Sequence, residues 1–571
     1  MGYILLEKDE IARLRRRRME GRAGLIYRRL MKLADETAAQ EPPIYRGNDP
    51  INRRALGWYF GRLGAMALVG VLEEDLEKVE AARRLLRAIY RIAEGSRTPL
   101  NASSGRLSVE PIQEGNILPE LIFVEHLLGQ SGLLGEGERG MLEQVYRWMF
   151  PFFLLGFTEI QLSVDPGNNH TLLDASSAGL LAARLGERLP LWRRWVEFCN
   201  EQVLLYAEFA ILEDGSQLEC SPSYHTLVVA RLLLHALLMR DMMGIELSDG
   251  LVWKAAAGVD WVLEVLTPDG HLPALNDSGR EFDPSFLFSS ASVLTQDGRY
   301  TSALDSFLQR EEFGFEKSTL PFGFVLASGC DLPGSSPLPE VPDAFLLPGA
   351  GFAVLREELG GYLICKSDPR HLCHTHDERC SFEWWPFGRP GALDPGKVDY
   401  QMLKHFSYFR MPNAHNTVAR YRPHRRDMRP QDGFFPDVEV SHDPHPPEPG
   451  GIELVKDGVK MWAKISEKVQ LRRTVLVEGN LGRLRVIDEL RGRDELPYDW
   501  CFHGRGRMEL SGRSFSFTSP ELRVEGEVVS PSEFQLVALS GPTGPYVAVR
   551  VRGSPERIEV VLSSSPQGGS G

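Results

Sequence analysis

The feature that most constrains the fold is a change of hydrophobic period at a proline-rich segment. The segment Asp331 to Asp343, DLPGSSPLPEVPD, cannot continue a helix, because proline lacks the backbone N–H and fixes one backbone torsion. Before it, apolar residues recur every three or four positions, and after it they alternate or form short β-branched runs. The pattern predicts a helical N-terminal half and an all-β C-terminal half.

The helical half is illustrated by VLEEDLEKVEAARRLLRAIYRIAE, in which Leu72, Leu76, Val79 and Leu86 fall on one helical face. Successive helices with short polar breaks indicate antiparallel helical hairpins. Further helices are expected at residues 119–129, 140–155, 172–186, 190–212, 223–244 and 250–266.

The C-terminal half contains the short runs GGYLICKS, KMWAKIS, YVAVRVR and ERIEVVLS. RTVLVEGNLGRLRVIDEL is a hairpin candidate with its turn near Gly479 to Gly482. These runs predict an antiparallel β-sandwich. A chain of 571 residues is also too long for one core, so we expect a helical domain at 1–335 and a β-sandwich domain at 344–565.

Composition excludes several classes of function. No apolar run has membrane-spanning length, and a net charge of −14 argues against nucleic acid as a partner. A locally basic run, Arg420 to Pro430, could still hold an acidic sugar, although a solvated loop is the alternative. The chain lacks a P-loop, a G-x-G-x-x-G after a strand and a G-x-S-x-G elbow, which removes nucleotide and serine-hydrolase chemistry.

Cysteine usage and the N-terminus bear on the cellular compartment. Seven scattered cysteines without a C-x-x-C pair indicate reduced thiols, and ligation of zinc by Cys373 and Cys380 is a minor alternative. The N-terminus shows no signal-peptide pattern. We therefore expect a cytoplasmic protein, with a periplasmic or secreted one as the alternative if a leader has been removed.

Chemistry-bearing residues gather in a few polar segments. HLCHTHDERCSFEWWPFGRPGALDPG and RMPNAHNTV together supply His374, His376, Asp394 and His415, which suit either a metal site or proton transfer. Two breaks of the helical half supply Asn-His at 169–170 and Tyr-His at 224–225. Amide and imidazole donors can stabilise the enolate-like state formed when a proton is removed beside a carboxylate. A Tyr or His can act as base, and a Tyr hydroxyl can return a proton to a departing glycosidic oxygen.

Six motifs in a fixed order carry a resemblance to a known family. They are NNH at 168–170, ECSPSYH at 219–225, HTHDERCSF at 374–382, LDPG at 393–396, AHNTV at 414–418 and DWCFH at 499–503. With them the chain resembles the heparinase II/III-like polysaccharide lyases, a group that includes heparin, heparan, chondroitin, hyaluronan and alginate lyases. The resemblance implies an incomplete (α/α) toroid followed by an antiparallel β-sandwich.

The resemblance also implies roles for individual residues. Asn169 and His170 would neutralise the substrate carboxylate, Tyr224 would be the general acid and, as an open alternative, also the base, and His374 would be a second proton-transfer or subsite residue. One departure is Leu173, which stands where some heparin lyases carry an acidic residue.

The same resemblance implies a mainly structural divalent metal. Its ligands would be His376, Asp394 and His415. Zinc suits two imidazoles and a carboxylate, with manganese or calcium as alternatives. An ordinary hydrogen-bonded network of the same three side chains is the competing interpretation.

Substrate contacts are expected from side chains around these motifs. An indole can stack on a sugar ring, but only one of Trp384 and Trp385 can face a cleft in strand geometry. Arginines such as Arg410 can hold sulfate or carboxylate groups. The predicted substrate-binding residues are His225, Glu219, Trp384, Arg410 and Asn416.

Together these observations favour a lyase that cleaves a uronate-containing polysaccharide by β-elimination, with a glycosaminoglycan such as hyaluronan, chondroitin sulfate or heparan sulfate as substrate. An alginate or oligoalginate lyase of the same fold is the alternative. A toroid glycoside hydrolase would instead use paired carboxylates from Asp214, Glu219 and Asp277. A catalytically silent carbohydrate-binding protein is the third alternative. The expected partner is an acidic poly- or oligosaccharide, with no nucleic acid or membrane, and the oligomeric state stays open, a homodimer included.

Overall fold

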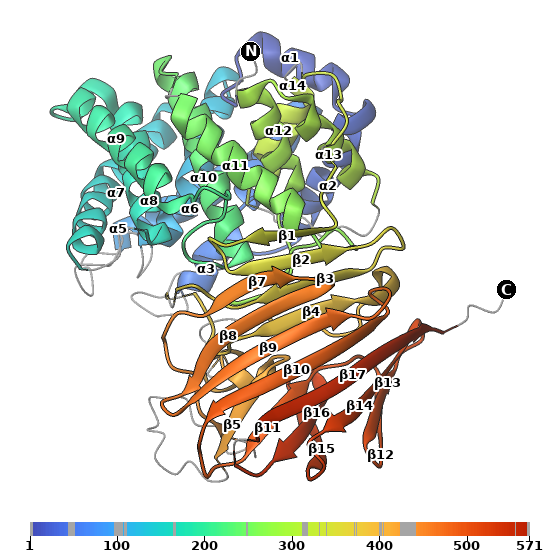
Figure 1. Ribbon diagram of the computed structural model, residues 1–571. Coiled ribbons are helices and arrows are strands. Elements are labelled where there is room, and N and C mark those ends of the chain that lie inside the picture. Colours follow the sequence, from blue (N-terminus) through green and yellow to red (C-terminus); the bar gives the residue numbers. More distant parts are fainter. Residues whose placement is uncertain are drawn as a thin grey trace. The chain divides into compact units, whose positions relative to one another are not determined.

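The chain forms two compact units, which Figure 1 draws in a computed structural model. The helical unit comprises Met1–Leu212, Thr226–Asp260 and Glu281–Pro339, and the β unit comprises Glu213–His225, Trp261–Arg280 and Glu340–Gly571. Two segments of the predicted domain 1–335 thus cluster with the strands rather than with the helices. The structure describes residues 4–43, 52–95, 107, 111–163, 167–246, 249–310, 318–329, 332–338, 340–370, 372, 374–398, 402, 405–422, 441–553 and 555–567.

The predicted helices are present, and sequential neighbours such as α4 and α5, α7 and α8, and α8 and α9 pack on each other. The helices are α1 (Lys8–Arg17), α2 (Gly21–Ala38), α3 (Asn52–Tyr59), α4 (Arg62–Glu73), α5 (Leu76–Gly95), α6 (Pro111–Gln130), α7 (Glu136–Ser163), α8 (Asn169–Leu185), α9 (Trp192–Ala210), α10 (Pro222–Met243), α11 (Asp249–Val265), α12 (Pro284–Thr295), α13 (Gly298–Leu308) and α14 (Leu320–Gly329).

One predicted helical face is interrupted. Glu74 adopts a left-handed backbone conformation that ends α4, and the Asp75 carboxylate accepts the N–H groups of Glu77 and Lys78 at the start of α5. An aspartate in this position satisfies N–H groups that have no partner within the helix. Val79 is buried on α5, whereas Leu76 is 68% exposed at its first turn. Among the described residues, no helix is both long and apolar enough to cross a bilayer.

The β unit consists of three antiparallel sheets, as the alternating runs predict. Their strand orders are β1-β2-β3-β4, β12-β13-β14-β17-β10-β9-β8-β7 and β15-β16-β11-β5-β6. The strands are β1 (Ala344–Leu347), β2 (Phe352–Arg356), β3 (Tyr362–Lys366), β4 (Ser381–Trp385), β5 (Val418–Arg422), β6 (Ser441–His442), β7 (Gly451–Val455), β8 (Gly458–Ser466), β9 (Val469–Val477), β10 (Arg483–Gly492), β11 (Tyr498–Phe502), β12 (Arg507–Ser511), β13 (Ser514–Thr518), β14 (Leu522–Ser530), β15 (Gln535–Gly541), β16 (Gly544–Val551) and β17 (Arg557–Pro566).

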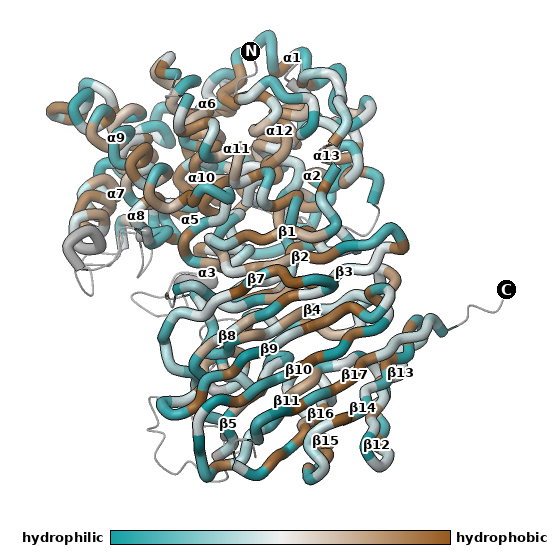
Figure 2. The backbone as a smooth tube through the Cα atoms, in the orientation of Figure 1, coloured by the Kyte–Doolittle hydropathy of each residue, from teal (hydrophilic) through white to brown (hydrophobic). Residues whose placement is uncertain are grey.

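The long strands show the burial that a sandwich requires. Alternate residues of β9 and β10 are buried, because successive side chains of a strand point to opposite faces. Figure 2 shows hydrophobic and hydrophilic residues succeeding one another along these strands. The predicted hairpin is confirmed, since Val477 of β9 pairs with Leu484 of β10 across the turn that contains Gly479. The buried faces of strands from all three sheets contribute to one hydrophobic core.

Candidate active site in the β unit

The centre of the candidate site is a pair of stacked rings. Tyr224 lies in the first turn of α10, and its ring stacks on the imidazole of His374, which lies in the loop between β3 and β4. The two ring centroids are 3.4 Å apart and the ring planes differ by 16°. The Lys397 ammonium lies 4.8 Å from the centroid of the same tyrosine ring. Both stacked side chains are partly exposed, so a ligand can reach them.

Asp277 holds three imidazoles of this region. One carboxylate oxygen bonds to Nδ1 of His374 at 3.1 Å, and the other lies 2.9 Å from Nε2 of His376 and 3.2 Å from Nε2 of His405. Burial would raise the pKa of the Asp277 carboxyl, but the hydrogen bonds from the three histidines lower that pKa well below its usual range. Asp277 is therefore a buried carboxylate that orients the histidine ring stacked on Tyr224.

Asn276, next to Asp277, ties together the segments that carry these side chains. Its backbone is left-handed, with φ of 59°, a conformation that asparagine tolerates better than most residues. Its side-chain amide donates to the Cys220 carbonyl at 2.8 Å and to Asp368 Oδ1 at 3.1 Å, and its side-chain oxygen accepts the His376 N–H at 3.0 Å. The loop before Tyr224, the end of β3 and the histidine segment are thus joined through one residue.

A fully buried ammonium group lies beside Asn276. Lys366, the last residue of β3, bonds to Asn276 and Glu378 and lies 3.2 Å from Asp368. Burial would lower the pKa of Lys366, but the carboxylates of Asp368 and Glu378 raise it above its ordinary value. This lysine lies within the apolar run GGYLICKS, so the sequence pattern predicted only a strand there.

The predicted metal ligands meet only in part. Donor atoms of His376, Glu378 and His415 lie within 4.8 Å of one another, whereas Asp394 bonds directly to Nδ1 of His415 at 2.6 Å. Among the described residues, Nδ1 of His376 is buried and has no hydrogen-bond partner. A buried imidazole nitrogen without a proton partner, next to a carboxylate and a second imidazole, fits a divalent ion.

A second group of donor atoms overlaps the first. Asp277, His376 and His405 also offer ligand atoms within 4.8 Å of one another. Glu378 lies in the motif HTHDERCSF but was not assigned a role from the sequence, and His405 lies outside all six motifs. His376 belongs to both groups, and it is the ligand that the sequence motif HTHDE indicated.

Glu219 reaches the stacked pair from the segment before Tyr224. Its carboxylate is buried, lies 3.7 Å from Nε2 of His374 and accepts the Gln217 amide at 3.3 Å. Glu219 thus lies beside the stacked pair, and its role toward a substrate stays a prediction. The paired-carboxylate interpretation has less support, because Asp214 accepts the Gly349 N–H at 2.6 Å and Asp277 is occupied by histidines.

Besides Glu219, which lies beside His374, three predicted substrate-binding side chains are buried, and we correct those predictions. Trp384 is 0% exposed and donates its indole N–H to the Leu481 carbonyl, because both faces of β4 are covered. Asn416 is also buried and donates to the Phe382 carbonyl at 3.0 Å. His225 is 1% exposed and packs on Trp261. These residues support the site rather than present a surface to a sugar.

Arg410 braces the histidine loop in this structure. Its guanidinium donates to the Thr375 carbonyl at 3.0 Å and lies 3.7 Å from Asp377. Of the basic run, Arg420 pairs with Asp443 and Asp494, while residues 423–430 lie outside the described residues, as does Cys373.

Asn169 and His170 belong to the helical unit, where they form the first turn of α8. Asn168 caps this helix by accepting the His170 N–H at 2.9 Å, and Tyr206 supports the preceding loop by donating to the Gly167 carbonyl at 3.1 Å. Asn169 is buried and His170 is partly exposed. Their role toward a carboxylate stays a prediction.

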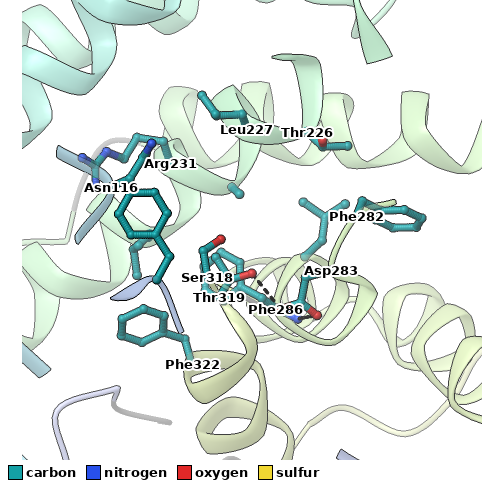
Figure 3. A pocket seen from close by; sticks show the side chains of 14 residues that line it. Asn116, Thr226, Leu227, Arg231, Phe282, Asp283, Phe286, Ser318, Thr319 and Phe322 are labelled. Atoms are coloured by element: carbon teal, nitrogen blue, oxygen red, sulfur yellow. Dashed lines mark hydrogen bonds between the residues drawn. The ribbon is translucent and has the colours of Figure 1, made fainter. Parts of the chain in front are cut away.

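The helical unit also encloses a cavity of about 120 Å³, shown in Figure 3. Apolar side chains such as Phe286 and Phe322 line it, together with the polar pair Asp283 and Thr319. Asp283 caps α12 and accepts the Thr319 hydroxyl at 2.7 Å. Because this polar pair serves the helix cap, we regard the cavity as a packing feature.

Comparison with known proteins places the chain in a family. The profile described as "Heparinase II/III N-terminus" matches residues 166–302, and the profile described as "Heparinase II/III-like, C-terminal" matches residues 339–564. The chain belongs to the heparinase II/III-like family. This heparinase II/III-like chain is accordingly a polysaccharide lyase, which confirms the resemblance carried by the six motifs. No curated protein matches it.

Solved structures agree with this fold. A structure of heparinase III matches with a TM-score of 0.65 at 14% identity, covering 92% of this chain and 78% of that chain. The heparan sulfate lyase HepC of Pedobacter heparinus, in a mutant form, matches with a TM-score of 0.61 at 14% identity, covering 95% and 84%. A Paenibacillus xanthan lyase matches with a TM-score of 0.52 at 10% identity, covering 99% and 60%. The heparinase II/III-like chain therefore has the helical toroid and β-sandwich that the resemblance implied.

Proposed function

We propose that the protein cleaves a uronate-containing polysaccharide by β-elimination, and that the substrate is a glycosaminoglycan such as hyaluronan, chondroitin sulfate or heparan sulfate. The observation that carries the proposal is the Tyr224–His374 pair with Asp277 behind the histidine. Two proton-transfer side chains in contact, one of them oriented by a carboxylate, suit a reaction that removes one proton and delivers another. Family membership supports the same chemistry.

The reaction makes two demands on the enzyme. A base must take the proton on C5 of the uronate, and the electrons of that C–H bond become the C4–C5 double bond while the bond from C4 to the glycosidic oxygen breaks. An acid must then give a proton to the departing oxygen. The C5 proton is weakly acidic because the neighbouring carboxylate is already negative, so positive or hydrogen-bonding groups at that carboxylate lower the barrier.

The hydrogen bond of Asp277 assigns a role to each nitrogen of His374. A carboxylate at Nδ1 holds the proton on that nitrogen, which leaves the lone pair on Nε2. We assign acceptance of the C5 proton to Nε2 of His374 and donation to the glycosidic oxygen to the Tyr224 hydroxyl. Glu219, 3.7 Å from Nε2, stabilises the imidazolium formed after proton transfer.

Charge near the pair supports an anionic substrate. The Lys397 ammonium lies over the Tyr224 ring, so positive charge is present where a uronate would bind. Asn169 and His170 keep the role implied by the family, which is neutralisation of the substrate carboxylate. Arg410 already donates to the Thr375 carbonyl in the loop that carries His374, so we do not assign it to the substrate.

A divalent ion, with zinc favoured over manganese or calcium, completes the proposal. His376, His415 and Glu378 would hold it, and Asp394 would orient His415 through their hydrogen bond. When bound, the ion supplies positive charge that fixes the loop carrying His374. The proton transfers are carried by His374 and Tyr224.

The test is incubation of the purified protein with heparan sulfate, chondroitin sulfate, hyaluronan and alginate, followed by mass analysis of the products. We expect ultraviolet-absorbing products with unsaturated uronate ends, each lighter by one water than the hydrolysis product. Turnover of alginate alone would overturn the glycosaminoglycan assignment, and saturated products would show hydrolysis instead of elimination. Tyr224→Phe should abolish turnover, whereas Tyr90→Phe, a matched change on α5, should leave it intact.

A further inference from the structure

Helix α9 lies at the edge of the helical unit (Figure 1), and four large apolar side chains in it or next to it are exposed, of which Phe198 also contacts Phe157. Leu191 is 63% exposed, Phe198 38%, Leu205 50% and Phe209 54%. Steps of seven and four residues keep Phe198, Leu205 and Phe209 on one face of the helix, and Leu191 is the residue before its first turn. We call this set the α9 stripe. The opposite face of α9 packs inward through Val196, Cys199, Val203, Tyr206, Ala207 and Ala210.

One flank of the α9 stripe is charged in a particular order. Arg194, Glu201 and Glu208 are all exposed, and their spacing of seven residues aligns them along the same side of the stripe. The flank is therefore positive near the N-terminus of α9 and negative toward its C-terminus. A surface with opposite charges at its two ends is complementary to itself when one copy is reversed.

We propose that the α9 stripe binds the α9 stripe of a second copy of this chain, with the two helices antiparallel about a twofold axis. Phe198 would then pack against Leu205 of the second copy, and the arrangement would be isologous. Arg194 would face Glu208 of the second copy, and the twofold axis repeats this ion pair. In a parallel arrangement the two charged flanks would lie on opposite sides of the contact, so the ion pair between Arg194 and Glu208 would not form.

The charges beside the α9 stripe also disfavour binding partners other than a second copy of this chain. Glu201 and Glu208 border the α9 stripe, so an acidic polysaccharide or an anionic bilayer would be repelled there. A second copy brings the matching arginine with it. The inference does not depend on the substrate proposed above, and it concerns residues of the helical unit, whereas Tyr224 and His374 belong to the β unit.

Sedimentation velocity of the full-length chain over a range of concentrations tests the proposal. We expect a concentration-dependent shift from monomer to dimer, and a dissociation constant raised at least about tenfold by Leu205→Glu, which places a charge in the centre of the contact. Arg194→Glu should weaken the dimer, and combining it with Glu208→Arg should restore it. Arg193→Glu is the matched control, because Arg193 lies off the stripe and should leave the association unchanged.

Glu201 supplies a test with the opposite sign. It lies near the middle of the stripe and would face its own copy across the twofold axis, so Glu201→Gln should tighten the dimer. A monomer at every concentration, a dimer insensitive to Leu205→Glu, or failure of the Arg194→Glu, Glu208→Arg double variant to associate would each overturn the proposal. All of these positions are exposed, so folding can be verified from an unchanged circular dichroism spectrum.

Discussion

The phenol ring of Tyr224 lies almost parallel to the imidazole of His374, with centroids 3.4 Å apart. Stacking fixes the relative position of the two rings, and the Asp277 hydrogen bond fixes the rotation of the imidazole. The two groups to which we assign proton transfer are thus held by contacts that involve no substrate. Such pre-arrangement lowers the entropic cost of reaching the transition state.

Replacing His374 by alanine should lower kcat by roughly 10²- to 10⁴-fold, the range expected for loss of a general base. Added imidazole should restore part of the activity, because a small base can occupy the space left by the side chain. Initial rates of formation of the unsaturated product measure both effects. His126→Ala, a change of a partly buried histidine in the helical unit, should neither reduce kcat nor respond to imidazole. Full activity of His374→Ala would instead assign both proton transfers to Tyr224.

Asp277→Asn should lower kcat by about 10²-fold while KM stays nearly constant. An amide in place of the carboxylate can hold the opposite tautomer of His374, so the lone pair would no longer lie on Nε2. The variant should fold, because asparagine preserves shape and can still hydrogen-bond. Steady-state kinetics give the kcat and KM values, and the control is Asp269→Asn, which alters a carboxylate bonded to Arg280 in the same loop region. An equal rise of KM with unchanged kcat would show that Asp277 acts in binding alone.

Purified protein should contain about one divalent ion per chain, and its removal should lower the melting temperature. His376→Ala and His415→Ala should both lose the ion, since their donor atoms lie together with Glu378. Elemental analysis and thermal unfolding with and without a chelator provide the measurements. His442→Ala, which removes a buried histidine bonded to Asp499, should keep the ion. Metal-free protein with full activity and stability would leave a hydrogen-bonded network as the correct interpretation.

The change of hydrophobic period predicted the two classes of secondary structure. The spacing of apolar residues follows which side chains of a helix or a strand are buried. The alternation in β9 and β10 located the hairpin. It failed for Trp384, because every residue of β4 is buried and strand alternation then cannot tell a cleft face from a core face. The break at Glu74 was missed, because a left-handed residue inside an otherwise periodic pattern has no strong signal when it is not glycine.

The site was predictable only where a motif marks it. Tyr224, His374 and His376 lie in recognisable motifs and contact one another or a shared carboxylate in the structure. Asp277 was named from the sequence only as a possible carboxylate of a glycoside hydrolase, and it is the fold that brings it to histidines nearly one hundred residues later in the chain. Lys366 was not predicted, because its neighbours in the sequence are the apolar residues of a core strand. A residue that orients other side chains can be identified only once its contacts are known.

The helical unit should lose stability as pH rises, because burial raises the pKa of several of its carboxyls, Glu120 among them. Glu120 of α6 is buried, and burial raises its pKa to about 8 from an ordinary value of 4.5, although the N–H groups of Gly61 and Gly64 oppose the shift. Since the folded state keeps the proton that the unfolded state loses, the free energy of unfolding should fall between pH 4.5 and about 8 and level off above it. The slope is about 1.4 kcal/mol per pH unit.

Glu120→Gln should flatten this dependence, because glutamine does not ionise. Denaturant unfolding from about pH 5 to about pH 8 measures the free energy of each variant. Glu77→Gln, a change of an exposed glutamate in the same unit, should leave the slope unaltered. An identical slope for the wild type and Glu120→Gln would mean that the two N–H groups keep the Glu120 carboxylate ionised in the folded state, and that its burial is fully compensated.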